Sequence, residues 1–178
     1  MKTNLLRWQF SGFIFTGIVG VLLHFLYEWS NENKLAAIFS GVNESTWEHM
    51  KLLFFPMLIF SLIEGFLIKE NYINYWGTKL KGILLGMLMI PTIFYTLNGM
   101  FGKTPDWLNI TIFFISAAIA YSYETKKLNH PNALYIPPAA VLLILSVITA
   151  LFIKFTFSPP HIPLFKDPLT YSYGLMQY

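Results

Sequence analysis

Long apolar segments alternate with short polar segments along most of the chain. The apolar segments cover residues 8–29, 50–68, 80–101, 107–123 and 136–157. A helix needs about 20 mostly apolar residues to cross a bilayer. Backbone groups in lipid must pair within their own segment, so the pattern predicts helices. We therefore expect an all-α integral membrane protein: a five-transmembrane-helix bundle that forms a single domain over residues 1–178.

Composition supports a membrane location and excludes several classes of function. Hydrophobic residues make up 55% of the 178 residues and charged residues only 12%, whereas a soluble domain is about 25% charged. There is no cysteine, which excludes thiolate ligands and cysteine nucleophiles. The net charge of +3 is spread along the chain, so we expect the lipid bilayer as partner and no nucleic acid. The bias toward Ile, Phe, Lys and Asn suggests a bacterial source.

Basic residues in the loops predict the orientation. An odd number of spans puts the termini on opposite sides of the membrane. The N-terminal side then holds seven basic residues: Lys2, Arg7, Lys69, Lys79, Lys81, Lys126 and Lys127. The other side holds five: Lys34, Lys51, Lys103, Lys154 and Lys166. This excess predicts a multi-pass protein of the cell membrane with a cytoplasmic N-terminus.

The densest polar segment is N-E-S-T-W-E-H-M-K at residues 43–51, directly before the second apolar segment. Polar groups beside a span are costly unless they cap a helix, pair or bind something. Ser45 and Glu48 match the S-x-x-E capping box, which explains them without any function. The cap leaves Asn43, Glu44 and His49 unexplained. We therefore place a candidate polar site on the predicted outer face.

Histidines extend this candidate site to other parts of the chain. His24 and Glu28 are spaced i, i+4 and share a helix face. An internal hydrogen bond would explain them, but helical zinc motifs use the same spacing. His24, His49 and His161 all map to the outer side. We predict these histidines and Glu28 as metal ligands, with zinc as the possible cofactor, although chance would also place three histidines on one side.

A bound zinc ion would make hydroxide available at neutral pH, because it lowers the pKa of its water. Glu44 and Glu48 are the candidate catalytic bases in this hypothesis. Asn43, Ser45 and Asn98 would complete the outer polar site. Glu64 lies near the inner boundary, where it could pair with Lys69, Lys79 or Lys81, or relay protons.

The C-terminal segment, residues 158–178, contains four prolines and many large apolar residues. Proline prevents a helix and favours extended geometry. We expect an extended Pro-rich tail that packs on the outer face of the bundle and brings His161 to the site. The alternative is a loosely held terminus.

Three segments carry a resemblance to a known group of proteins. They are N-E-S-T-W-E-H-M-K-L-L-F-F-P at residues 43–56, H-F-L-Y-E-W at 24–29 and P-P-H-I-P-L-F-K-D-P at 159–168. They resemble an uncharacterised family of small polytopic bacterial membrane proteins. The resemblance implies an integral membrane protein and carries over no established activity. A looser similarity, in residue types only, is to membrane hydrolases that hold zinc between helices.

Two classes of function remain open from the sequence. The leading hypothesis is a metal-dependent hydrolase-like enzyme that acts on a lipid or membrane-proximal substrate. The alternative is a small transporter, or a binding subunit of a membrane complex, with no catalytic activity. A third interpretation makes the polar segment purely structural and places the function in oligomer contacts.

Overall fold

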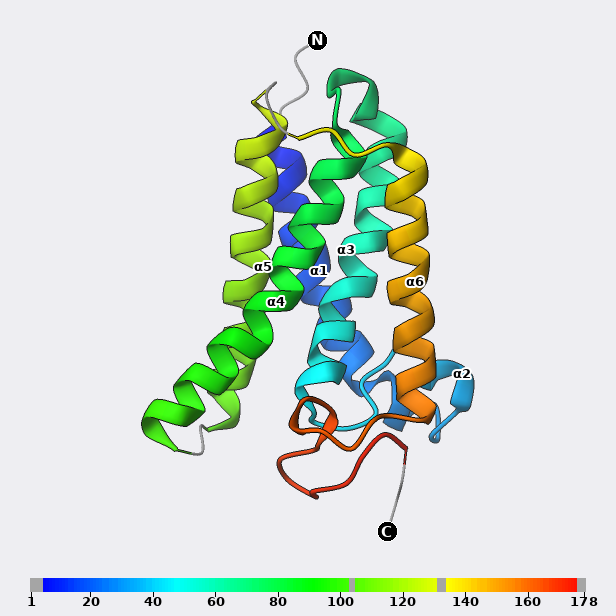
Figure 1. Cartoon of the computed structure of the whole chain (residues 1–178), viewed down its shortest axis with the longest axis vertical. Coiled ribbons are helices and arrows are strands. Elements are labelled where there is room, and N and C mark those ends of the chain that lie inside the picture. Colours follow the sequence, from blue (N-terminus) through cyan, green and yellow to red (C-terminus); the bar gives the residue numbers. More distant parts are fainter. Residues whose placement is uncertain (1–4, 103–104, 131–133, 176–178) are drawn as a thin grey trace.

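The computed structural model describes residues 5–102, 105–130 and 134–175. The described elements are α1 (Leu5–Trp29), α2 (Lys34–Ala37), α3 (Thr46–Ile68), η1 (Lys69–Asn71), α4 (Tyr75–Phe101), α5 (Asp106–Leu128), α6 (Pro138–Phe157) and η2 (Pro163–Phe165). The five long helices alternate in direction, so the two termini lie at opposite ends of the bundle (Figure 1). We call the end with the start of α1 the N-terminal end, and the end with residues 158–175 the C-terminal end.

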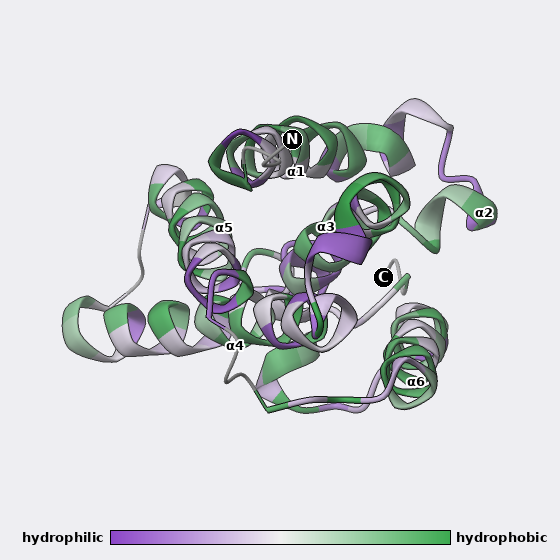
Figure 2. Cartoon of the chain, turned by 90° about the horizontal axis from the view of Figure 1, so that it is seen from above, coloured by the Kyte–Doolittle hydropathy of each residue, from purple (hydrophilic) through white to green (hydrophobic). Residues whose placement is uncertain are grey.

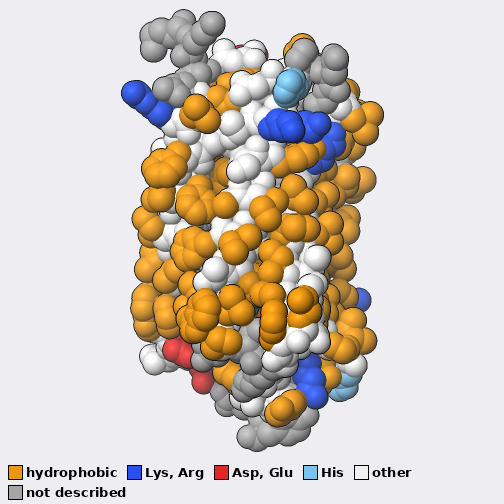
Figure 3. Space-filling model, turned by 90° about the vertical axis from the view of Figure 1, so that its left-hand side faces the viewer, with side chains coloured by type: hydrophobic (Ala, Val, Ile, Leu, Met, Phe, Trp, Pro, Cys, Tyr) orange, Lys and Arg blue, Asp and Glu red, His pale blue; other side chains and the backbone are white. Residues whose placement is uncertain are grey.

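Four of the described helices are long and apolar enough to cross a membrane: α1, α3 with η1, α4 and α6. Apolar side chains cover the middle of the surface in Figure 3, and the charged side chains visible there gather toward the two ends. The bundle is therefore all-helical and compatible with a multi-pass membrane protein.

Helix α5, expected as the fourth of five spans, is not among these four helices. It nevertheless lies within the bundle beside α1 and α4 (Figures 1 and 2). Its buried face includes Ser116, Tyr121 and Glu124. These polar residues lower the mean hydropathy of α5. The bundle accommodates them because they face other helices and not the surroundings.

Helix α3 is the most buried of the four apolar helices and lies between α1 on one side and α4 and α6 on the other (Figure 2). Leu53 and Phe54 are fully buried in the main core. Phe152 of α6 reaches the same core and packs against the Trp47 ring at a centroid distance of 4.6 Å. Gly86 of α4 allows close approach of α5, because a side chain there would meet Ala120 and Leu53.

Two helices depart from tight packing. Helix α4 contains Pro91, and beyond its middle it bends away from the bundle (Figure 1), as expected where proline interrupts the backbone hydrogen bonds. Helix α6 begins at Pro138, a favoured position for proline. Between α3, α4 and α6 lies an apolar groove of about 620 Å³.

Several helices extend beyond the apolar segments that predict them. Helix α3 begins at Thr46 and not at residue 50, α4 begins at Tyr75 and not at residue 80, and α5 continues to Leu128. Hydropathy does not detect these added turns because they carry polar residues. The same turns hold His49, Lys79 and Glu124, which take part in the sites below.

Candidate functional site

The connection between α1 and α3 places the polar segment, residues 43–51, beside the C-terminal end of α1. Ser40 anchors the connection, because its hydroxyl donates to the Leu23 carbonyl and accepts from the Tyr27 amide, the latter at 2.9 Å. Ser45 then caps α3 by accepting from the Glu48 amide at 3.4 Å. The Ser45 amide donates to Asn43 Oδ1 at 2.9 Å. Only one of the two hydrogen bonds of the predicted capping box is therefore present, because the Glu48 carboxylate does not accept from the Ser45 amide.

Glu44 contacts the imidazoles of two different helices. Its Oε1 lies 3.4 Å from His24 Nε2 on α1, and its Oε2 lies 3.6 Å from His49 Nε2 on α3. The two histidine rings are 5.9 Å apart between centroids. The side chains are 31%, 37% and 18% exposed for His24, Glu44 and His49 respectively. We call this arrangement the His24–Glu44–His49 site.

The hydrogen bond of the His49 ring shows which of its two nitrogens carries the hydrogen. Nδ1 lies 3.0 Å from the Ser45 carbonyl oxygen. A carbonyl oxygen can only accept, so Nδ1 carries the hydrogen and donates. Nε2, the nitrogen that faces Glu44, is then the position that gains or loses a proton. Imidazole is suited to this exchange because its ordinary pKa is near neutral.

A cavity of about 160 Å³ adjoins the site between α1, α3 and α5. Its wall includes His24 and His49 together with apolar residues such as Val21, Phe25 and Ile110. Phe25 and Ile110 are exposed on the surface of the bundle. The site therefore borders a hollow whose rim is apolar and faces the surroundings of the helices.

Asn109 of α5 is a site residue that sequence reasoning missed. It lines the same cavity and also the smaller one that touches Glu44 and His49. Its Oδ1 is buried and accepts no hydrogen bond from any described residue. Its position as an isolated amide within an apolar segment was the available signal.

Glu48, predicted as a catalytic base, is engaged elsewhere. Its carboxylate forms a buried ion pair with Lys51 and accepts from the Val42 amide at 3.2 Å. Lys51 also donates to the Ala37 carbonyl and to Thr156 Oγ1, both at 2.9 Å. This network joins α2, α3 and α6, and it leaves Glu44 as the carboxylate of the His24–Glu44–His49 site.

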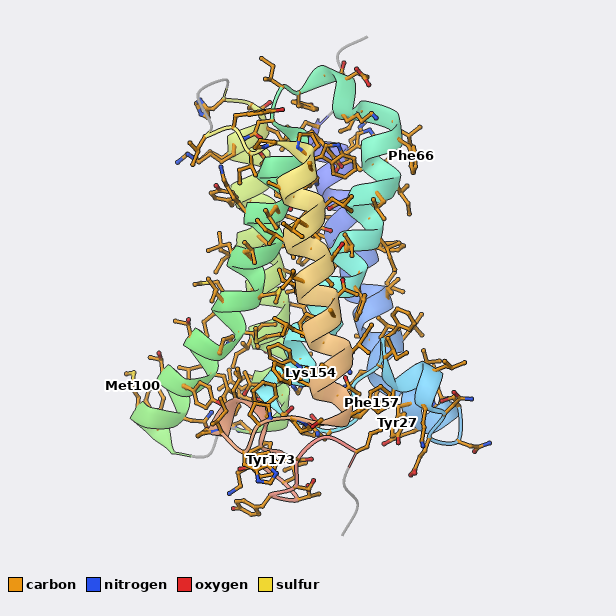
Figure 4. All side chains as sticks on the ribbon, turned by 45° about the vertical axis from the view of Figure 1, so that its right-hand side comes forward. Tyr27, Phe66, Met100, Lys154, Phe157 and Tyr173 are labelled. Atoms are coloured by element: carbon orange, nitrogen blue, oxygen red, sulfur yellow. The ribbon has the colours of Figure 1, made fainter. Side chains whose placement is uncertain are left out.

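The described part of the C-terminal tail contacts the polar segment. Asn43 Nδ2 donates to the Gly174 carbonyl at 3.1 Å, and the Glu44 amide donates to Asp167 Oδ2 at 3.3 Å. Phe165 is buried against Trp47. Figure 4 shows Tyr173 beneath the bundle, at the end where Lys154 and Phe157 lie in the last turn of α6. The tail therefore holds the loop that carries Glu44.

Three predicted site residues are not shown to join the site. His161 is exposed, and its ring stacks on Tyr173 at 4.6 Å. Glu28 is exposed, and within the described residues no ion pair joins it to His24, which faces Glu44 instead. Asn98 lies on the bent part of α4, where it donates to the Phe94 carbonyl at 2.9 Å.

The donor groups do not fit the predicted zinc site. Among residues 5–102, 105–130 and 134–175, no group of three or more histidine or carboxylate side chains is placed to hold a metal ion. Structural and catalytic zinc sites use three or four protein ligands. The two imidazoles and the Glu44 carboxylate instead contact one another. Proton transfer is therefore the chemistry that these three side chains support.

A second cluster lies at the N-terminal end and includes Glu64. Lys79 of α4 binds both Glu64 of α3 and Glu124 of α5, the latter at 2.6 Å. Glu64 also accepts from Gln9 Nε2 at 2.8 Å and from the Tyr75 hydroxyl at 3.0 Å. Lys79 was one of the three lysines expected to pair with Glu64. Glu124 and Gln9 were missed, because they lie far from Glu64 in sequence.

The fold and its two clusters define an all-helical protein with four helices able to cross a membrane. The chain belongs to DUF6512, a family of unknown function, whose model matches residues 1–175. No curated protein and no solved structure matches the chain. The family agrees with the resemblance to an uncharacterised family and assigns no activity.

Proposed function

We propose that this chain is a multi-pass membrane protein whose His24–Glu44–His49 site performs acid–base chemistry on a lipid or membrane-proximal substrate. One observation carries the proposal. A partly exposed carboxylate lies within 3.4 to 3.6 Å of imidazoles from two helices, beside a cavity with an apolar rim. Such a cavity suits an apolar chain, while the site offers polar groups to a headgroup.

Hydrolysis is the reaction class that these groups support without a cofactor. His49 Nε2 would accept a proton from a water molecule as its oxygen attacks an ester carbon or phosphorus. The ester bond to the leaving oxygen breaks, and His24 would donate a proton to that oxygen. Glu44 would stabilise whichever imidazole is charged. Positioned acid–base groups typically contribute about 10²- to 10⁴-fold in rate.

The test uses the full chain reconstituted in vesicles of phosphatidylethanolamine and phosphatidylglycerol. Mass spectrometry would measure released fatty acid, diacylglycerol and headgroup. We expect turnover that falls about 100-fold or more in Glu44→Gln and in His49→Gln. Lys34→Gln, an exposed change on α2, is the matched control and should leave turnover unchanged. Absence of turnover, or equal turnover in all variants, would overturn the proposal.

Metal analysis of the same purified chain separates this proposal from the zinc-dependent form of the hypothesis. Acid–base chemistry by the site alone should persist after chelation. Stoichiometric zinc that is lost in His49→Ala would instead favour the metal-dependent form.

The second candidate is a small proton-coupled transporter or a binding subunit of a membrane complex. The buried carboxyl groups around Lys79 favour it, because ionisable groups inside helical membrane bundles often mark ion pathways. A pH-sensitive dye inside proteoliposomes would report proton movement. Movement that survives replacement of His24, His49 and His161, but not Glu64→Gln, would favour transport over hydrolysis.

A further inference from the structure

We propose that Glu64, Lys79 and Glu124 form a proton-binding site that holds one proton at neutral pH and exchanges it with water at the N-terminal end. The site is separate from the His24–Glu44–His49 site and does not depend on the proposed hydrolysis. Its ligand is the proton itself. The inference rests on the count of charges, on the partners of each carboxyl oxygen and on a neighbouring polar cavity.

The charges of the cluster do not balance. Glu64, Lys79 and Glu124 are at most 2% exposed, and two carboxyl groups share one ammonium group. The described residues that hydrogen-bond to the cluster or place a ring against it are neutral: Gln9 from α1, Tyr75 from α4 and Tyr121 from α5. A buried charge without a counter-ion costs several kcal/mol. One bound proton makes the cluster neutral.

The hydrogen-bond partners show which carboxyl group should carry the proton. Both oxygens of Glu64 face donors, since Oε1 accepts from Gln9 and Oε2 accepts from Tyr75 and Lys79. Donors on both oxygens favour the ionised form of a carboxyl group. In Glu124 only Oε2 has a donor, which is Lys79, while Oε1 is buried and has no partner among the described residues. Oε1 of Glu124 is therefore the atom that carries the proton.

The glycine at position 82 leaves room for the Glu124 carboxyl group. Glu124 Oε1 lies against Gly82, where any larger residue would overlap it. Gln9 is 3% exposed, and its Oε1 is a second buried oxygen without a donor among the described residues. The unpaired Oε1 of Glu124 points to a missing hydrogen, because buried polar atoms are almost always paired.

A cavity with polar lining residues lies near this cluster at the N-terminal end. A cavity of about 160 Å³ at the N-terminal end is lined by residues that include Asn74, Thr78, Lys127, Leu128 and His130. Thr78 directly precedes Lys79, and Leu128 lies one helical turn beyond Glu124, about 6 Å along the axis. The cavity therefore lies about one helical turn from Glu124, and we infer that the proton exchanges with water through it.

Infrared spectroscopy of the full chain in lipid nanodiscs tests the proposal directly. Glutamate labelled with ¹³C at the side-chain carboxyl identifies the C=O stretch of a protonated glutamate. At pH 7 we expect one protonated glutamate per chain. We expect none in Glu124→Gln and none in Glu64→Gln, because each variant leaves one carboxylate opposite one ammonium. Lys79→Met should show two, because both carboxyl groups then lack their counter-ion.

Glu70→Gln is the matched control, since Glu70 is exposed at the same end of the bundle, and it should leave one protonated glutamate. The wild-type spectrum tests the proposal even if a variant does not fold. No protonated glutamate in the wild type at pH 7 overturns the proposal. A band that persists in Glu124→Gln, or persists in Glu64→Gln, overturns the shared-proton site.

Discussion

The two polar clusters lie at opposite ends of the bundle and differ in their exposure and in their contacts. The His24–Glu44–His49 site is partly exposed, borders a cavity and has contacts of 3.4 to 3.6 Å. The Glu64–Lys79–Glu124 cluster is almost fully buried and directly hydrogen-bonded. Exposed ion pairs contribute about 0–1 kcal/mol, whereas breaking a buried pair costs about 3–5 kcal/mol. The first cluster should therefore contribute little to stability, whereas the second should hold the helices together.

Lys79→Met should cause the largest loss of stability. It removes the ammonium that binds both Glu64 and Glu124, so the free energy of unfolding should fall by about 3–5 kcal/mol. Thermal unfolding in nanodiscs measures it. Lys81→Met, at a half-buried neighbour that donates to the Leu134 carbonyl, should cost no more than about 1.5 kcal/mol.

Gly82→Ala should have the next largest effect. The added methyl group would overlap the Glu124 carboxylate, and overpacking of this kind costs about 1–3 kcal/mol. Gly99→Ala in the same helix is the matched control, because nothing lies within 4 Å of its added methyl group. It should be neutral or stabilising by up to about 1 kcal/mol through helix propensity. Equal effects of the two changes on the unfolding temperature would contradict the packing against Glu124.

His24→Gln and Glu44→Gln should change stability by less than about 1 kcal/mol each, because their contacts are partly exposed. The same unfolding assay compares them with Lys79→Met. A loss near that of Lys79→Met would show that this end also depends on its ion pairs. Small losses combined with lost lipid turnover would separate function from stability.

Single cysteines test the predicted orientation with no expected effect on stability. The chain has no native cysteine, so each introduced thiol is unique. Ile73 lies at the N-terminal end and is 85% exposed, and Leu169 lies in the tail and is 51% exposed. Two variants, Ile73→Cys and Leu169→Cys, therefore carry one accessible thiol each. A cytoplasmic N-terminus predicts that an impermeant thiol reagent labels only Leu169→Cys in intact cells. The opposite labelling pattern would reverse the topology.

The sequence anticipated the apolar helices well and the sites only in part. Hydropathy located all five long helices, because a helix that packs against lipid or against other apolar helices is apolar over most of its length. It placed the start of α4 at residue 80 and so missed the turn that contains Lys79. The i, i+4 spacing paired His24 with Glu28, whereas the fold pairs His24 with Glu44. Spacing along one helix cannot show which residue a connecting loop brings beneath it.

What the sequence alone determined is therefore local. Three features follow from residues near one another in the chain. They are the low content of charged residues, the apolar segments of membrane-spanning length and the serine cap before α3. Tertiary structure decided which polar residues meet. Gln9, Glu64, Lys79 and Glu124 come from four helices, and His24, Glu44 and His49 come from two helices and a loop. Buried charges need partners, and only helix packing determines which distant residues become those partners.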